Sequence, residues 1–535
     1  MPFVSRILST TASLVLAVVF VSQVTAAPPP LDYLYPAGGQ RGQTITVTAG
    51  GTFKTWPVKV WTDRDEIKIV PTKDKGKLSI TIPKNAKPGV CWLRLHDQDG
   101  ASPIRPFQIG VTQESIEKEP NNEPEKAQSV SEKSLIMNGR LQSRGDVDVF
   151  SLTLKKGDTL IASLQANEIT RSPMDGILQL LSADGFVLAQ NDDYHGMDPQ
   201  LVYPVTEDGV YFVRIFSFPA TATSSISFAG GNNFVYRLTL TTEGFADHAH
   251  PIAVSKEHPQ PVEVVGWNLP ADTKPYQAID GHIVHPKIAN VISVRDEQAK
   301  IVKEHANNAD NPPPLEIPTS IAGHIHKSKE TDVFAVKMKK GQRLQVDIIA
   351  SGAGSPLDPV LTFSDSSGKL IKESMSRTIG QDPSLLVSAT KDGVYRVTVT
   401  DLHNRGGKRF FYLLQLSEPK ADFTLKTTKD QYVVTAGKPL EISITIIRIN
   451  NFKEPVTIRA EGLPTGIQAE DVKISAKDKS VKLVVKCDDK LVSGPFRIVG
   501  IVSGKEERIR VVMATATEIN ATTPFLWISS AKKKK

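Results

Sequence analysis

The feature that most constrains the fold is a strand–turn–strand pattern in the first third of the chain. Apolar and polar residues alternate over 147–154, which is the period of two that a half-buried β-strand shows. The alternation predicts that Phe150, Leu152 and Leu154 face a core. A Lys-Gly-Asp turn at 156–158 precedes a second strand, so the unit is predicted to be a hairpin.

A second copy of the whole unit begins near Ile301, and its motifs follow in the same order as in the first. The matching motifs are Asp148-Val149-Phe150 with Asp332-Val333-Phe334, Lys155-Lys156-Gly157 with Lys339-Lys340-Gly341, Ser172-Pro173-Met174-Asp175 with Ser355-Pro356-Leu357-Asp358, Asp198-Pro199 with Asp382-Pro383, and Asp208-Gly209-Val210-Tyr211 with Asp392-Gly393-Val394-Tyr395. Ordered matches over a full unit indicate an internal repeat of one folded module.

Four motifs of the first module resemble a known family. They are EPNN at 119–122, DVDVFSLTLKKGDTL at 146–160, Ser-Ala-Asp-Gly at 182–185 and DGVYFVRI at 208–215. Together they resemble the bacterial pre-peptidase C-terminal (PPC) domain. The resemblance implies a jelly-roll-like β-sandwich of the kind appended to secreted peptidases and other exported proteins, similar to the collagen-binding domains of clostridial collagenases.

An acidic linker before the first hairpin supplies the best candidate for a metal site. Its oxygen-bearing residues, with two at the strand start, are Glu117, Glu119, Asn121, Asn122, Asp146 and Asp148. Ca²⁺ binds about six to eight such oxygens, and a linker that folds onto a strand start can deliver them. The collagen-binding relatives imply the same arrangement, so Ca²⁺ is the expected cofactor of the first module. The alternative is a solvated acidic linker followed by aspartates that cap a turn.

The second module departs from this pattern. When Asn307-Asn308 is aligned on the two asparagines of the first linker, Lys303 and His305 take the places of the two glutamates. Glu304 then lies one place out of register, and Glu330 replaces the first aspartate. A cation and an imidazole weaken a site for a hard cation, so calcium is expected mainly in the first module.

The remaining sequence predicts an all-β protein, a multi-domain string of β-sandwiches in which two jelly-roll-like PPC modules alternate with immunoglobulin-like sandwiches. A chain of 535 residues is too long for one core, and short strands between Gly and Pro turns recur along it. The opening YPAGGQRGQTITVTAGG also resembles immunoglobulin-like modules of the IPT type. The predicted units are a signal peptide (1–26), an immunoglobulin/IPT-like sandwich (27–111), the first PPC-like module (112–243), a small immunoglobulin-like unit (244–299), the second PPC-like module (300–419), a C-terminal immunoglobulin-like sandwich (420–519) and a basic tail (520–535).

The N-terminus predicts an exported protein. Arg6 precedes a short apolar run at 14–21, and small residues follow at 24–26, as in a secretory signal peptide. No other apolar run approaches the length of a membrane-spanning helix, so no transmembrane segment is expected. The net charge of +6 is mild and mixed in sign, which argues against a nucleic-acid partner. Location in the periplasm, at the cell surface or outside the cell stays open.

The two cysteines, Cys91 and Cys487, exclude a disulfide framework and are expected to be buried thiols. A bridge between them would need a hairpin-like overall shape.

Catalytic motifs are absent from the sequence. It has no G-x-S-x-G elbow, no H-E-x-x-H and no phosphate- or dinucleotide-binding fingerprint, so no enzyme is expected. His248-Ala249-His250 and His324-Ile325-His326 each put two imidazoles on one face of a strand, but without a third ligand they are interpreted as ordinary exposed histidines.

The expected function is therefore non-catalytic binding or scaffolding, with an extracellular protein or polysaccharide as the ligand. Aromatic residues could contact such a ligand, as they do in the collagen-binding relatives, although alternation assigns half of them to the core; they are Tyr203, Tyr211, Phe212, Tyr395, Phe410, Phe411 and Tyr412. The alternative is an accessory component, or a catalytically degenerate relative, of a secreted peptidase.

Overall fold

The computed structural model describes residues 28–221, 227–271, 278, 281–304, 312–376, 378, 380–488, 490, 492–504 and 507–531. The described residues form strands β1 to β46 and three short 3-10 helices, with no α-helix among them, which confirms the all-β fold class. Within the same ranges, no helix is long and apolar enough to cross a membrane. The predicted signal peptide and the terminal lysines at 532–535 lie outside the described residues.

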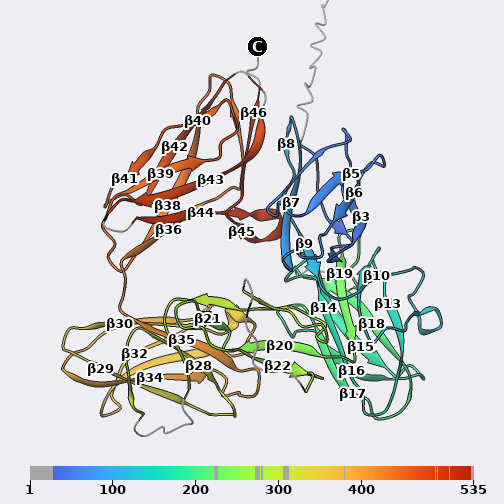
Figure 1. Cartoon of the computed structure of the whole chain (residues 1–535), viewed down its shortest axis with the longest axis horizontal. Coiled ribbons are helices and arrows are strands. Elements are labelled where there is room, and N and C mark those ends of the chain that lie inside the picture. Colours follow the sequence, from blue (N-terminus) through green and yellow to red (C-terminus); the bar gives the residue numbers. More distant parts are fainter. Residues whose placement is uncertain are drawn as a thin grey trace, which may run out of the picture.

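The N-terminal domain is a sandwich of two sheets (blue in Figure 1). One sheet has the strand order β1-β3-β6-β5 and the other β2-β9-β7-β4, with β8 paired to β7. Alternate residues such as Val47, Leu78, Leu93 and Phe107 fill the core between the sheets. The strands are β1 Leu34–Tyr35, β2 Gly38–Gln40, β3 Thr44–Ala49, β4 Lys59–Thr62, β5 Lys68–Pro71, β6 Lys77–Thr81, β7 Gly89–Asp97, β8 Gly100–Ala101 and β9 Arg105–Gly110.

The first module is a sandwich of two five-stranded sheets, β10-β12-β19-β14-β17 and β11-β13-β18-β15-β16. Phe150, Leu152 and Leu154 on β13 are at most 5% exposed, which confirms the predicted inward face. The elements are β10 Glu114–Ile116, η1 Pro124–Lys126, β11 Gln128–Val130, β12 Ser134–Arg140, β13 Asp148–Leu154, β14 Thr159–Gln165, β15 Met174–Leu181, β16 Val187–Asn191, β17 Gln200–Pro204, β18 Gly209–Pro219 and β19 Val235–Thr241.

The unit that links the two modules differs from the predicted immunoglobulin-like sandwich. Its described residues form three two-stranded sheets, β20-β22, β21-β25 and β23-β24, around a small core that includes Val262 and Ile283. The unit also packs against its neighbours, because Phe245 joins a cluster with Ile161 of the first module and Ile252 one with Phe411 of the second. The strands are β20 Phe245–His250, β21 Ala253–Ser255, β22 Glu263–Trp267, β23 His282–Ile283, β24 Ile292–Ser293 and β25 Arg295–Glu297.

The second module repeats the first strand for strand. Its sheets have the orders β26-β28-β35-β30-β33 and β27-β29-β34-β31-β32, which are the orders of the first module with each strand replaced by its counterpart. The elements are β26 Ile301–Lys303, β27 Pro314–Leu315, β28 Thr319–His324, β29 Asp332–Met338, β30 Arg343–Ile349, η2 Ser351–Ala353, β31 Pro359–Asp365, β32 Leu370–Met375, β33 Ser384–Ser388, β34 Gly393–Asp401 and β35 Phe411–Ser417.

The repeated motifs have the same structural roles in both copies. Each Asp-Pro aspartate accepts three consecutive backbone N–H groups: those of residues 166–168 for Asp198 and of residues 350–352 for Asp382. Each tyrosine of the Asp-Gly-Val-Tyr motif donates its hydroxyl to the carbonyl four residues upstream, Tyr211 to Glu207 and Tyr395 to Lys391. The sequence repeat is therefore a repeat of structure.

The C-terminal domain is a larger β-structure with the main strand order β37-β46-β43-β44-β36-β38-β42-β40. Residues 521–531 correct the predicted boundary, because they form β45 and β46 rather than a tail, and β46 pairs with β37 and β43. The elements are β36 Asp422–Thr427, β37 Gln431–Thr435, β38 Leu440–Ile449, β39 Val456–Glu461, β40 Ile467–Ala469, β41 Val472–Ile474, β42 Ser480–Cys487, β43 Ser493–Val502, β44 Arg508–Ala516, η3 Thr517–Ile519, β45 Ala521–Thr523 and β46 Leu526–Ala531.

The string of domains closes on itself, so that the first and last domains lie side by side (Figure 1). A buried ion pair joins them, with Arg94 Nη2 at 2.6 Å from Asp430 Oδ2. The Trp61 ring packs against the rings of Phe525 and Trp527. Although the first and last domains therefore meet in a hairpin-like shape, no disulfide joins Cys91 and Cys487.

Candidate metal centre in the first module

The linker between β10 and β11 of the first module crosses from one sheet to the other, and on its way it contacts the start of β13. It leaves β10 at Glu117, whose N–H donates to the carbonyl of Asn138, and it rejoins the sandwich as β11, parallel to β13. Between these points the carbonyl of Asn121 accepts the N–H of Val149 at 2.9 Å. The backbone itself therefore holds the linker against the two aspartates that flank the strand start.

Three carboxylates converge where the linker meets the strand. One oxygen from each of Glu119, Asp146 and Asp148 lies within 4.8 Å of the other two, and this is the only such group of three or more in the described residues. Two oxygens bound to one Ca²⁺ at about 2.3–2.6 Å can be at most about 5 Å apart. The spacing of the three carboxylates therefore suits a shared cation.

The side-chain amide of Asn121 lies against the same carboxylates and is fully buried. With its nitrogen facing the carboxylates, this amide donates N–H to Glu119 Oε2 at 2.8 Å and to Asp148 Oδ1 at 3.2 Å. Oxygen and nitrogen of an amide are assigned from their neighbours. The amide can thus satisfy the carboxylates without a cation, or turn its oxygen inward as a fourth ligand.

Two tyrosine hydroxyls form hydrogen bonds with the buried acids next to the cluster. The Tyr236 hydroxyl lies 2.5 Å from Asp148 Oδ2 and 3.1 Å from Glu117 Oε2, and Tyr35 of the N-terminal domain donates to Glu117 Oε1 at 3.1 Å. Burial raises the pKa of Glu117 to about 7, and burial with the neighbouring Glu117 charge raises the pKa of Asp148. A divalent cation would relieve this concentration of buried acidic groups.

The six predicted residues divide into two roles. Glu119, Asp146 and Asp148 present carboxylate oxygens to one another, whereas two amides donate to them: Asn121 to Glu119 and Asp148, and Asn122 to Asp146 Oδ1 at 2.8 Å. Glu117 is occupied by the two tyrosine hydroxyls.

Sequence reasoning missed three residues that shape the cluster. Gln142 donates to Glu119 Oε1 at 3.1 Å, and Tyr236 and Tyr35 hold the buried acids. Gly139 faces Tyr236 across the ladder, and a Cβ there would come within 2.1 Å of the tyrosine ring. The Tyr236 and Gly139 positions recur as Tyr412 and Gly323 in the second module, which is the signal that could have found them.

The second module keeps the buried half of this arrangement and corrects the predicted alignment. Glu304, not Lys303, takes the place of Glu117, because its N–H donates to Ala322 as that of Glu117 donates to Asn138. Tyr412 donates to Asp332 Oδ2 at 2.6 Å, and burial raises the pKa of Asp332 to about 7. The sequence alignment of the two linkers was out of register because the second linker is shorter than the first. His305 and the Asn307-Asn308 pair lie outside the described residues.

The two His-x-His motifs also differ from the expectation, because the structure brings them together. The ring of His324 lies 4.3 Å from that of His250 and 5.9 Å from that of His248, and His248 is only 5% exposed. Burial lowers the pKa of His324 to about 3. His326 contacts Glu304 Oε1 at 3.0 Å. The histidines therefore form the packed junction between the linking unit and the second module.

The aromatic candidates for ligand contact are mostly core residues. Tyr211, Tyr395, Phe411 and Tyr412 are at most 6% exposed. Tyr203, Phe212 and Phe410 are half-buried. Alternation along the strands thus assigns most of the set to the interior.

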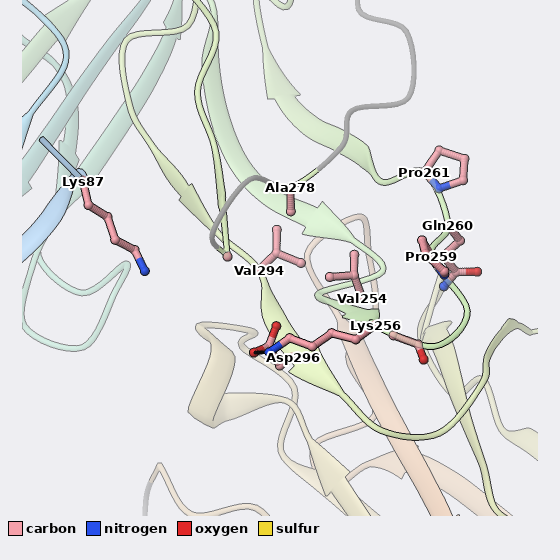
Figure 2. Close-up of a pocket in the computed structure, with 11 residues that line it drawn as sticks. Lys87, Val254, Lys256, Pro259, Gln260, Pro261, Ala278, Val294 and Asp296 are labelled. Carbon is pink, nitrogen blue, oxygen red and sulfur yellow. Dashed lines mark ion pairs between the residues drawn. The ribbon is translucent and has the colours of Figure 1, made fainter. Parts of the chain in front are cut away.

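A large open cavity of about 890 Å³ lies away from the acidic cluster. Figure 2 shows Lys256 extending to Asp296, with Lys87 of the N-terminal domain reaching toward them. Aliphatic residues including Val254 and Val294 complete the lining, and Asp296 is the only carboxylate among the lining residues that the structure describes. These lining residues therefore offer a cation fewer carboxylates than the linker cluster does.

The fold and the acidic cluster together define a class of domain, a β-sandwich in which a linker near the N-terminus folds onto the start of β13. The family described as "Bacterial pre-peptidase C-terminal domain" matches residues 146–217, from the turn before β13 into β18. The first module therefore contains the PPC match, and the second module has the same strand order.

Known proteins resemble parts of the chain. A probable subtilase-type serine protease of Deinococcus radiodurans is 28% identical over 123 residues, which are 22% of this chain and 17% of the protease. The pre-peptidase C-terminal domain of a Bacillus anthracis collagenase is 15% identical, with 23% of this chain and 98% of that chain covered and a TM-score of 0.16. A Bacteroides ovatus glucan-utilisation protein, solved with a mixed-linkage heptasaccharide, is 10% identical, with 72% and 74% covered and a TM-score of 0.15. These TM-scores carry no argument about function.

Proposed function

We propose that the protein is an exported, non-catalytic binding or scaffolding protein whose PPC modules bind an extracellular protein or polysaccharide. The observation that supports this most is the convergence of Glu119, Asp146 and Asp148 with the Asn121 amide at the start of the first module. Ca²⁺ bound there fixes the linker to β13 and so fixes the first module against the N-terminal domain, which reaches the same cluster through Tyr35.

Each side chain has a defined part in this binding site. The carboxylates of Glu119, Asp146 and Asp148 supply charge and oxygens, and Asn121 supplies a neutral oxygen when its amide is turned inward. Asn122 and Gln142 hold Asp146 and Glu119 in place through hydrogen bonds. The set reaches four protein ligands, so water or backbone oxygens complete the coordination of Ca²⁺.

The test measures ligand binding by the full chain with Ca²⁺ and with a chelator. A panel of immobilised secreted proteins and polysaccharides is compared for the unmodified protein and for Glu119→Gln/Asp146→Asn. We expect binding of at least one panel member to weaken in the chelator and in the variant. The matched control is Glu304→Gln/Glu330→Gln in the second module, which should bind as the unmodified chain does. Equal binding under all conditions contradicts a calcium-dependent function.

A second candidate function is that of an accessory component of a secreted peptidase, favoured by the match to part of the Deinococcus radiodurans protease. In that case the chain alone leaves a casein-type substrate intact, and a separate peptidase chain co-purifies with it. Hydrolysis of the substrate by the purified chain, with normal sensitivity to protease inhibitors, contradicts both non-catalytic functions.

A further inference from the structure

Both modules expose one sheet edge at the same place. Among the described residues, β16 and β32 are the last strands of their sheets, and each pairs on one side only, β16 with β15 and β32 with β31. Both pairs carry a register irregularity at the same point of the hairpin. An edge strand presents a row of unpaired backbone groups, which is a template for another strand unless the protein blocks it.

The register lets the two edges be compared residue by residue. Val187 pairs with Leu181 as Leu370 pairs with Ser364, and Ala189 pairs with Leu180 as Lys372 pairs with Phe363. The corresponding residues, first module before second, are Phe186 and Lys369, Val187 and Leu370, Leu188 and Ile371, Ala189 and Lys372, and Gln190 and Glu373.

The first edge is open and uncharged. Phe186 is 71% exposed, Val187 50% and Leu188 39%, and residues 186–191 include no charged side chain. Exposed apolar residues at the start of an edge strand, with a third directly before it, are an arrangement that monomeric proteins usually avoid.

The second edge carries the usual protection. Lys369, Lys372 and Glu373 place charges at three of the five compared positions, and Lys372 Nζ donates to the carbonyl of Leu386 at 2.9 Å. Charged residues on an edge disfavour the approach of another strand. The second module thus protects its edge strand β32 with charged residues, whereas the first module does not protect β16 in this way.

Acidic residues flank the open edge at both ends. Asp184 is exposed in the turn before β16, and Asp192 and Asp193 are exposed just after it. Burial and the nearby charges of Asp193 and Asp192 raise the pKa of Asp175 on β15. Antiparallel pairing of two copies through β16 would bring Asp184 of one copy toward Asp192 and Asp193 of the other. Charge therefore favours a strand with basic ends over a second copy of this chain.

We propose that β16 is a docking edge for an extended segment of a partner protein, apolar at alternate positions and carrying Lys or Arg at its ends. The segment adds to the sheet beside β16 through backbone hydrogen bonds, packs its apolar face beside Leu188 and the preceding Phe186, and pairs its basic ends with the flanking aspartates. The inference rests on the proposed binding function and names its partner class. None of the calcium-cluster residues belongs to this edge, so the two can fail separately.

The test uses the full chain and a fluorescent peptide of sequence Lys-Val-Thr-Val-Thr-Val-Lys. Anisotropy should show saturable binding, about tenfold weaker for the same peptide with Glu at both ends and lost when the central Val is Pro, which cannot complete the ladder. Phe186→Lys/Ala189→Lys, which imports the residues of the second edge, should weaken binding at least about tenfold. The reciprocal Lys369→Phe/Lys372→Ala variant should gain a second binding site. Amide exchange at 187–191 should slow when the peptide binds.

Three results overturn the proposal. The first is the absence of saturable binding by the Lys-ended peptide, and the second is equal binding by Phe186→Lys/Ala189→Lys. The third is a concentration-dependent dimer in sedimentation that this variant abolishes, which assigns the edge to a second copy. If the peptide fails while Ca²⁺ still controls panel binding, only the edge assignment falls. If Ca²⁺ has no effect while the peptide binds β16, only the calcium-dependent function falls.

Discussion

The two PPC-type modules share one backbone topology and differ in the residues that surround the buried aspartate at the start of β13 or β29. Both place a tyrosine against a buried aspartate beneath a glycine, Tyr236 with Asp148 and Tyr412 with Asp332. Only in the first do three carboxylates converge within the described residues. The comparison teaches that the buried acid belongs to the architecture of the module, whereas the proposed cation site depends on the carboxylate that the linker adds.

The largest expected effect tests the shared interior. A Cβ at Gly139 would lie 2.1 Å from the Tyr236 ring, and one at Gly323 would lie 2.3 Å from the Tyr412 ring. Gly139→Ala and Gly323→Ala should each lower the free energy of unfolding by about 3 kcal/mol or more, because the ring and its carboxylate partner must move. Urea unfolding followed by hydrogen exchange in each module measures the loss. If either substitution leaves the free energy of unfolding unchanged, the two modules do not share this interior arrangement.

The next effect separates the two tyrosines. Tyr236 serves two carboxylates, Asp148 and Glu117, whereas Tyr412 donates to Asp332. Tyr236→Phe should therefore destabilise its module by about 2–3 kcal/mol and Tyr412→Phe by about 1–2 kcal/mol, since a buried acceptor loses its donor in each case. The same unfolding experiment compares them, and equal losses would show that the Glu117 contact adds nothing.

The pH dependence of the second module follows from Asp332. Burial raises its pKa from 3.8 to about 7, so the folded state binds the proton more tightly than the unfolded state does. Stability is then gained as the pH falls from about 7 to about 4 and lost as it rises through the same window, by an amount on the order of 4 kcal/mol because the carboxyl is buried. Asp332→Asn should flatten this slope in thermal unfolding of the full chain. An unchanged slope assigns the titration to another group.

The smallest expected effect on stability concerns an exposed contact of the second module. His326 of the second module contacts Glu304, and its side chain is 62% exposed. Because exposed pairs contribute little, His326→Gln should change the stability by less than about 0.5 kcal/mol. A larger loss in calorimetric unfolding would mean that the histidine junction depends on this contact.

Local pattern predicted much of the fold, because alternation alone places Phe150, Leu152 and Leu154 in a core. It also predicted the members of the acidic cluster, since the linker and the strand start are close in sequence. It could not supply Tyr236 or Tyr35, which reach the cluster from a distant strand and another domain. The last strand β46 was missed because its polar end, Ser529-Ser530, and the lysines beyond it look like a tail in the sequence.

The central claim, that the first module holds a calcium site and the second does not, is tested most directly by the number of Ca²⁺ ions bound per chain. Isothermal calorimetry of the full chain should give one ion, and Glu119→Gln/Asp146→Asn should abolish it while Glu304→Gln/Glu330→Gln leaves it intact. At a hundredfold excess over Kd, the bound ion should stabilise the fold by about 2.7 kcal/mol. Two ions, or one that survives the first variant and is lost in the second, would contradict the account.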